Sequence, residues 1–160
     1  MAVVELLLSP LPAHVRTARL VTVAAARRAG LDDELIDEVR LAVGEACSRA
    51  VGLHARHAAD VPVRITVEDG PAGLVVTVVD VGPAAGPVPQ DVSADIVEGG
   101  ELESYDDGHE LVDPDVALAL LTGLVDSAVV EPGTDGTTVT LRWPLPVGAS
   151  GPGATAIARA

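Results

Sequence analysis

Lysine, cysteine and aromatic residues are almost missing from this sequence of 160 residues. It contains no lysine and no phenylalanine, and one residue each of tryptophan, tyrosine, methionine and cysteine. A hydrophobic core therefore has to be built from valine, leucine, isoleucine and alanine. The single Cys47 excludes an internal disulfide and suits a reducing compartment. We interpret Cys47 as a small buried side chain rather than a nucleophile.

Long apolar runs and a targeting segment are missing as well. No run approaches the roughly 20 apolar residues that a membrane-spanning helix needs. The opening residues Met1 to Glu5 lack the basic region of a signal peptide. The length suits one domain with a core of its own. The sequence thus predicts a cytoplasmic protein without a membrane segment.

Positive charge is scarce. Twenty-four acidic residues stand against 10 basic ones, all of them arginine, and the formal net charge is −14. This charge repels phosphate backbones, so we exclude nucleic acid as a partner and favour a basic protein surface. The acids concentrate between Gly82 and Asp113, a stretch without any arginine. Such a stretch is typical of a solvated, mobile loop, and its alternative role is to bind an arginine-rich partner.

Apolar periodicity predicts a mixture of helices and strands. We expect strands at 3–8, 61–68, 74–80, 127–130 and 137–143, and helices at 14–29, from 32 to about 57–60, and at 114–125. This order predicts an α/β two-layer sandwich, in which a mixed, mainly antiparallel sheet carries the helices on one face. One domain spans residues 1–146 with a long acidic loop at about 83–113, and residues 147–160 form a disordered tail.

Three short motifs lie on these elements in a recognisable order. The first is the run LAVGEACSRA at 41–50, on the second helix; the second is VDVG at 79–82, and the third is GTTV at 136–139. Together they resemble the ATP-site motifs of the anti-sigma factor serine kinases. That family belongs to the ATPase superfamily of histidine kinases, gyrase and a heat-shock chaperone. The resemblance covers about residues 3–145 and implies the ATPase-domain fold of that superfamily.

The resemblance also implies roles for individual residues. Glu45 takes the place of the family's base for a serine hydroxyl of a partner protein. Asp80 matches the carboxylate that accepts a hydrogen bond from the adenine amino group. Gly82 is then the glycine of close approach, and Thr137 supports the adenine contact.

Two departures from the family pattern affect the phosphate side of this site. The family's magnesium-binding asparagine is replaced by Arg49, a permanent cation with no acceptor atom. The glycine-rich phosphate segment is replaced by ELVDPD at 110–115, whose Asp113 and Asp115 repel phosphate. The residues Arg49, Asp80, Gly82 and Thr137 are therefore interpreted as a remnant of a nucleotide site, with no cofactor and no metal expected.

We favour a regulatory protein that binds a sigma factor or an anti-anti-sigma antagonist, with kinase activity weak or absent. Two alternatives stay open. One is an active serine kinase that phosphorylates the antagonist using ATP and magnesium, with Glu45 as base. The other is a sensor that binds a nucleotide or small ligand in the remnant pocket. A homodimer is compatible with each of them.

The same residues also have plainer structural interpretations. Glu45 and Arg49 are four residues apart on a helix, a spacing that favours a surface ion pair. Asp80 is the last residue of a predicted strand, and Thr137 is of a residue type that is common in strands. His54 and His57 stand three apart near a helix end, where histidines are usually solvated, and nothing nearby predicts a metal site.

Overall fold

In a computed structural model of the chain, the described residues are 1–82, 125 and 127–145. They form two helices and five strands. Their bounds are β1 Ala2–Leu8, α1 Pro12–Ala29, α2 Asp33–His57, β2 Val63–Gly70, β3 Gly73–Asp80, β4 Ala128–Pro132 and β5 Thr137–Pro144. The predicted acidic loop, third helix and tail lie outside the described residues, apart from Val125.

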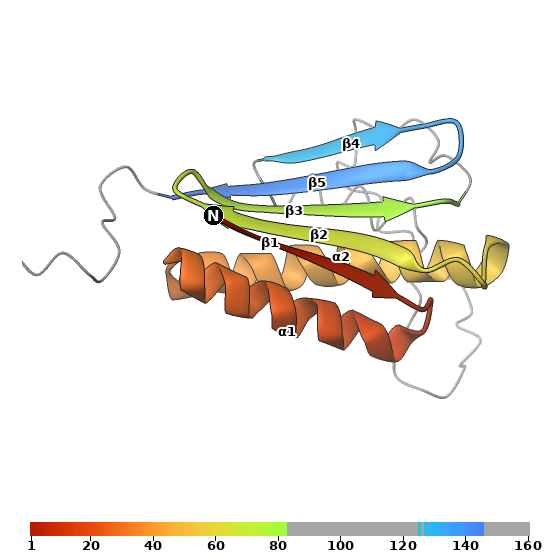
Figure 1. The fold of residues 1–160 in the computed structure, drawn as a ribbon, viewed down its shortest axis with the longest axis horizontal. Coiled ribbons are helices and arrows are strands. Elements are labelled where there is room, and N and C mark those ends of the chain that lie inside the picture. The colour runs from red at the N-terminus through yellow and green to blue at the C-terminus, as the bar shows by residue number, and fades with distance from the viewer. Residues whose placement is uncertain (83–124, 126, 146–160) are drawn as a thin grey trace, which may run out of the picture.

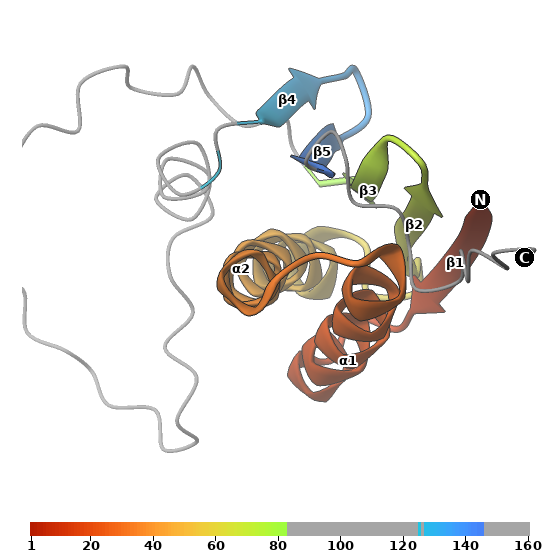
Figure 2. The ribbon, with the colours of Figure 1, turned by 90° about the vertical axis from the view of Figure 1, so that its left-hand side faces the viewer.

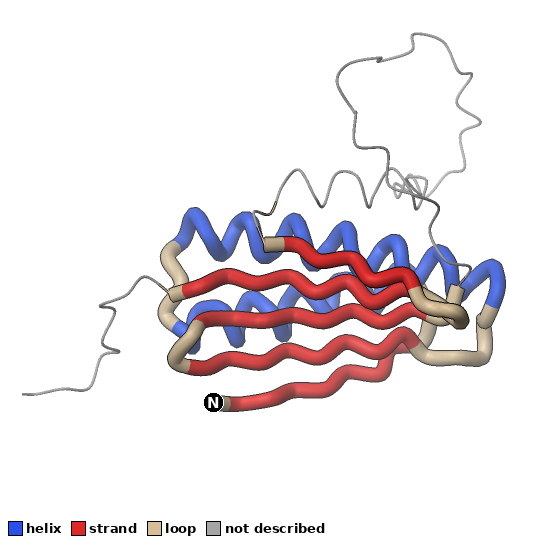
Figure 3. Tube along the Cα trace, turned by 90° about the horizontal axis from the view of Figure 1, so that it is seen from above, coloured by secondary structure: helices blue, strands red, loops and turns tan. Residues whose placement is uncertain are grey.

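The five strands form one sheet in the order β1-β2-β3-β5-β4, and each neighbouring pair is antiparallel. Both helices lie on the same face of this sheet (Figures 1 and 2). Seen from above, the strands run side by side over the two helices (Figure 3). The predicted two-layer sandwich is confirmed, and among the described strands its sheet is antiparallel throughout.

Alternating side chains explain which face of the sheet is covered. In β2, Val63, Ile65 and Val67 are buried, whereas Arg64 and Glu68 are exposed. A strand turns successive side chains to opposite faces, so this pattern places the valines and isoleucine against the helices. Helix α1 packs on β2 and β3, and α2 packs on β2, β3 and β5. The aliphatic core predicted from the composition lies between these two layers.

Local signals set the ends of the helices. Helix α1 begins at Pro12, before the predicted His14, because the first turn of a helix needs no amide hydrogen. It ends at Ala29, and the next residue, Gly30, closes the last turn with a left-handed φ of 91°. Helix α2 follows at once, and the Asp32 side chain caps it by accepting a hydrogen bond from the Leu35 amide at 2.9 Å.

The only tryptophan ties the sheet to a helix. Trp143 in β5 is 2% exposed, and its Nε1 donates to the Glu38 Oε1 in α2 at 2.9 Å. A buried indole ring needs a partner for its N–H, and Glu38 supplies it. The bond therefore fixes α2 against β5 near one end of the sheet.

Neither described helix combines the length and the apolar character that crossing a membrane requires.

The β2–β3 hairpin is tighter than predicted. Asp69 and Gly70 belong to β2 and not to the turn, because Asp69 pairs with Leu74 and with Ala2 of β1. The turn itself is the pair of residues 71–72. Gly73 follows with φ 126°, and a Cβ atom there would collide with the carbonyl oxygen of Trp143. Only glycine suits this position.

We expect Gly73→Ala to lower the free energy of unfolding by at least about 2 kcal/mol, because strain and collision act together. Gly30→Ala is the matched control, since Gly30 also has positive φ but nothing lies within 4 Å of its added Cβ. That control should lose only about 1 kcal/mol. Urea unfolding followed by Trp143 fluorescence measures both losses. Equal losses would contradict the collision.

Candidate functional site

Three of the residues singled out in the sequence meet beside α2, where β3 ends and β5 begins. Asp80 is the last residue of β3, Thr137 is the first of β5, and the two are register partners. Arg49 reaches them from α2, with its Nη1 2.5 Å from the Asp80 Oδ2. Both side chains of this ion pair are 1% exposed. The motifs thus converge on one buried carboxylate.

Backbone amides complete the surroundings of Asp80. Its Oδ1 accepts hydrogen bonds from the Gly82 amide at 3.1 Å and from the Thr137 amide at 3.3 Å. Its Oδ2 faces Arg49, whose Nη2 also lies 3.5 Å from the Thr137 hydroxyl. Both oxygens of Asp80 therefore accept hydrogen bonds from donors of the chain itself. Two of these donors are backbone amides, whose positions are fixed by the fold.

Two glycines permit this close packing. A Cβ atom on Gly136 would collide with the carbonyl oxygen of Asp80. A Cβ atom on Gly82 would lie 2.8 Å from the Cβ of Leu53 in α2. The glycines of the second and third motifs therefore let β3, β5 and α2 approach one another. The close approach that the resemblance assigned to Gly82 is here an approach to the helix.

The predicted ion pair between Glu45 and Arg49 is wrong. Arg49 turns into the interior and pairs with Asp80, because a buried carboxylate attracts a guanidinium more strongly than a half-exposed one. Its Nε is buried without a hydrogen-bond partner. Glu45 stays half-buried one turn earlier on α2, and no bond among the described residues joins it to the cluster.

These residues do not fit the recognition of adenine or magnesium. For Asp80 to accept a hydrogen bond from an adenine amino group, a ligand has to reach a carboxylate that is 1% exposed and held by Arg49. Displacing Arg49 would leave two buried charges apart, which is costly. A guanidinium also cannot ligate a cation. Within the described part of the chain, no cluster of three potential metal ligands occurs.

His54 lies next to the cluster around Asp80, and the sequence interpretation missed it. It was expected to be solvated, but its side chain is fully buried. Its Nε2 accepts a hydrogen bond from the Val81 amide at 2.9 Å, beside Asp80. The signal was present, since His54 follows Ala50 by four residues and continues the apolar stripe of the helix. His57 is exposed, as predicted.

The Cys47 thiol is unreactive. Its side chain is completely buried in α2, and the pKa of the thiol is raised to about 12, because burial outweighs the opposing charge of Arg19. The thiolate is the reactive form of cysteine, so this thiol is protected at neutral pH. Its interpretation as a packing residue is confirmed.

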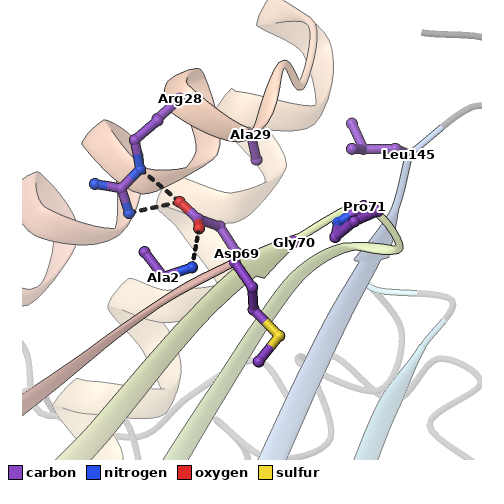
Figure 4. A pocket seen from close by; sticks show the side chains of 8 residues that line it. Ala2, Arg28, Ala29, Asp69, Gly70, Pro71 and Leu145 are labelled. Atoms are coloured by element: carbon purple, nitrogen blue, oxygen red, sulfur yellow. Dashed lines mark hydrogen bonds and ion pairs between the residues drawn. The ribbon is translucent and has the colours of Figure 1, made fainter. Parts of the chain in front are cut away.

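A cavity of about 590 Å³ lies at the far end of the sheet from Asp80, beside the β2–β3 turn. Its most polar feature is an ion pair between Arg28 of α1 and Asp69 of β2 (Figure 4). The Arg28 Nε donates to the Asp69 Oδ2 at 2.6 Å, and the Ala2 amide donates to the Oδ1 at 2.8 Å. The arrangement closes the corner between β1, β2 and α1.

Burial by itself raises the pKa of the Asp69 carboxyl. Hydrogen bonds from Arg28 and from the Ala2 amide, with the charge of Arg28, outweigh burial and hold the pKa below its ordinary value of 3.8. The folded state therefore favours the ionised carboxylate. Asp69 contributes stability above its unfolded pKa, and this stability is lost as the pH falls through the lower, folded pKa.

The chain is similar to known proteins in its sequence and in its fold. The sequence profile of the histidine kinase-like ATPase domain matches residues 8–143. The fold is similar to the crystal structure of the RsbU and RsbW domains of Rv1364c from Mycobacterium tuberculosis, with a TM-score of 0.59 and 19% identity. The match covers 91% of this chain and 34% of that one. No curated protein matches the sequence significantly.

We expect a strong coupling between Arg49 and Asp80 in stability. Arg49→Met or Asp80→Asn alone should lower the free energy of unfolding by about 3–5 kcal/mol, because each leaves one buried charge unpaired. The double variant removes both charges, while the side-chain oxygen of the asparagine introduced in place of Asp80 still accepts from the two backbone amides. Its loss should be far smaller than the sum of the single losses. Urea unfolding measures all three.

The exposed pair of Arg64 and Glu5, at 3.3 Å, supplies the control for this cycle. Arg64→Met should change stability by less than about 1 kcal/mol, because water screens a surface pair. Additive losses at Arg49 and Asp80, or a loss at Arg49 as small as that at Arg64, would show that the buried pair is not coupled.

We also expect Asp69→Asn to weaken the protein at neutral pH and to make little difference in acid. The variant lacks the ionised carboxylate that Arg28 stabilises, whereas the unmodified protein loses the same contribution only when Asp69 is protonated. The difference in unfolding free energy should therefore shrink as the pH falls below about 4. Urea unfolding at a series of pH values measures it, and a constant difference would contradict the role of Asp69.

Proposed function

Because the chain belongs to the histidine kinase-like ATPase domain family, we propose that it is a partner-switching regulator that binds proteins without phosphorylating them. Fold membership alone does not decide this, since the family's scaffold serves more than one chemistry. The proposal rests on one observation, the buried ion pair between Arg49 and Asp80. It places a fixed cation on the carboxylate that adenine recognition would require.

In this proposal the chain has no nucleotide chemistry and acts through a protein-binding surface. The proposed partners are a sigma factor or an anti-anti-sigma antagonist, as the resemblance of the three motifs implies. A net charge of −14 favours basic surfaces on those partners and steers them electrostatically. The protein would act by occupying its partner, and exchange between the two partners would be its switch.

The sequence also disfavours phosphate binding at a second place, independently of Arg49. In sequence, the acids Asp113 and Asp115 replace the glycines that would present backbone amides to phosphates. Phosphoryl transfer depends almost wholly on positioning and on charge neutralisation by metal. Arg49 cannot supply both functions, because it neutralises Asp80 instead of a phosphate. Glu45, in the place of the base for a serine hydroxyl, would therefore have no positioned phosphate for that hydroxyl to attack.

We predict no binding of ATP, with or without magnesium, when the purified protein is titrated in a calorimeter. Arg49→Asn should restore little binding, because it repairs only one of the two defects. Arg64→Asn, on the exposed face of β2, is the matched control for removal of an arginine. The fluorescence of Trp143 checks that each variant is folded, because this side chain is buried.

A direct assay tests the partner side of the proposal. The protein should co-elute with a sigma factor or candidate antagonist of its own genome, and radiolabelled ATP should leave no phosphate on the antagonist. Phosphorylation that Glu45→Ala abolishes would establish the kinase and overturn the proposal. Binding of ATP without magnesium would indicate that the chain is a sensor. If none of the sigma factors or antagonists binds, the proposal of a partner-switching regulator is refuted.

A further inference from the structure

Strand β1 lies at one edge of the sheet, where β2 is its neighbour among the described strands (Figure 2). Its sequence, AVVELLL, has six apolar residues and one charged residue. Edge strands are usually protected by charges, by proline or by a short length, whereas near-continuous apolar runs are typical of strands buried inside a sheet. Strand β1 therefore has the composition of an inner strand and the position of an outer one.

Both faces of β1 are incompletely covered. On the outer face of the sheet, the exposed fractions of Val3 and Leu7 are 57% and 59%. On the face toward the helices, Val4 and Leu6 are only half-buried, because α1 packs on β2 and β3. The central residue of the neighbouring strand, Ile65, is fully buried. A further strand beside β1 would thus cover apolar side chains on both faces of the sheet.

The opposite edge of the sheet is protected. Strand β4 is five residues long, ends in Pro132 and carries Glu131, and each of these features disfavours the addition of another strand. Strand β1 has seven residues and no proline. Its one charged residue, Glu5, already pairs with Arg64 of β2 at 3.3 Å. Of these two edges, β1 is the one suited to accept a strand.

The distribution of charge along the chain permits two copies to meet at β1. Residues 1–29, which contain β1 and α1, have four arginines and one acidic residue, a net charge of +3. Residues 30–160 have six arginines and 23 acidic residues, a net charge of −17. Two such chains repel each other in most orientations. Contact through β1 brings together the parts that lack this excess of acid.

The sequence of β1 is self-complementary about Glu5. When two copies pair antiparallel around this residue, side chains directly opposite each other lie on the same face of the sheet. Val3 then lies opposite Leu7 of the second copy on the outer face. Val4 lies opposite Leu6 of the second copy on the face toward the helices. Two-fold symmetry forms each apolar contact twice, which favours a second copy over an unrelated strand.

Charged residues of β2 fit the same register. Arg64 is the register partner of Leu7, and Glu68 is that of Val3. Each apolar pair across the contact would therefore be flanked by Arg64 of one copy and Glu68 of the other, which have opposite charges. The two Glu5 side chains meet at the symmetry axis, and each keeps Arg64 of its own chain as a counter-ion.

We propose that β1 is a dimerisation edge, which pairs antiparallel with β1 of a second copy in register about Glu5, so that the two sheets become one. Backbone hydrogen bonds between the strands supply affinity, and the apolar pairs select the register. This inference goes beyond the proposed function and does not rest on it, because it concerns the surface that joins two copies, whatever other protein they bind.

The first experiment measures the mass of the full chain by analytical ultracentrifugation between about 1 and 100 µM, where we expect a dimer. Leu7→Lys should raise the dimer Kd by at least about tenfold, because it removes an apolar contact at two symmetric places. Val129→Lys is the matched control, since Val129 is an exposed valine of the other edge strand, and it should leave the Kd unchanged. The fluorescence of Trp143 checks folding, and Val3→Lys replaces Leu7→Lys if that variant unfolds.

The second experiment locates the symmetry axis by disulfide formation with oxidised glutathione. Opposite residues of antiparallel strands have Cα atoms about 4.5–5.5 Å apart, which a disulfide can bridge. Glu5→Cys should therefore link two copies at least about tenfold faster than Glu131→Cys, the control on β4. The native Cys47 does not interfere, because it is buried.

Several results would overturn the dimerisation edge. They are a chain that stays monomeric over the whole concentration range, a dimer that Leu7→Lys leaves intact, and a dimer that Val129→Lys weakens equally. A Glu5→Cys variant that links no faster than Glu131→Cys would refute the register. If Leu7→Lys abolishes binding of a sigma factor or antagonist to a monomeric chain, β1 is a docking site for that partner and the dimer is refuted, whereas the proposed function stands.

Discussion

The ion pair of Arg49 and Asp80 joins the helical layer to the sheet at a place where neither side chain is open to water. It sets how α2 lies against the ends of β3 and β5. Thr137 completes the cluster with its amide and its hydroxyl. The small size of Gly136 lets β5 come close enough for this. The contact between α2 and the ends of β3 and β5 therefore depends on the charges of Arg49 and Asp80, each of which neutralises the other.

Such a pair does not stabilise the fold in proportion to its short distance. Removing two charged groups from water is costly, and their attraction does little more than offset that cost. The consequence is selectivity for one arrangement, because any rotation of α2 that separates Arg49 from Asp80 leaves two buried charges uncompensated. Electrostatics thus specify the helix orientation, whereas the aliphatic core supplies most of the driving force.

The sequence predicted the architecture well because local patterns determine most of this fold. Alternation in β2 and the helical stripe of α2 each follow from neighbouring residues. The motifs also brought Asp80, Gly82 and Thr137 to one site. The partner of Arg49 was missed because local spacing favoured Glu45, whereas Asp80 lies 31 residues away. His54 was missed because a helix end was taken to mean solvent, although the chain next to β2 and β3 covers this end.

The central strands β3 and β5 are neighbours in the sheet but lie far apart in the sequence. The Asp80 side chain meets an amide 57 residues further on, at Thr137. Bringing two segments together across so long a stretch of chain has an entropy cost that grows with the logarithm of their separation. During synthesis, however, β3 keeps an unpaired edge until β5 emerges, which makes completion of the sheet a late and slow event.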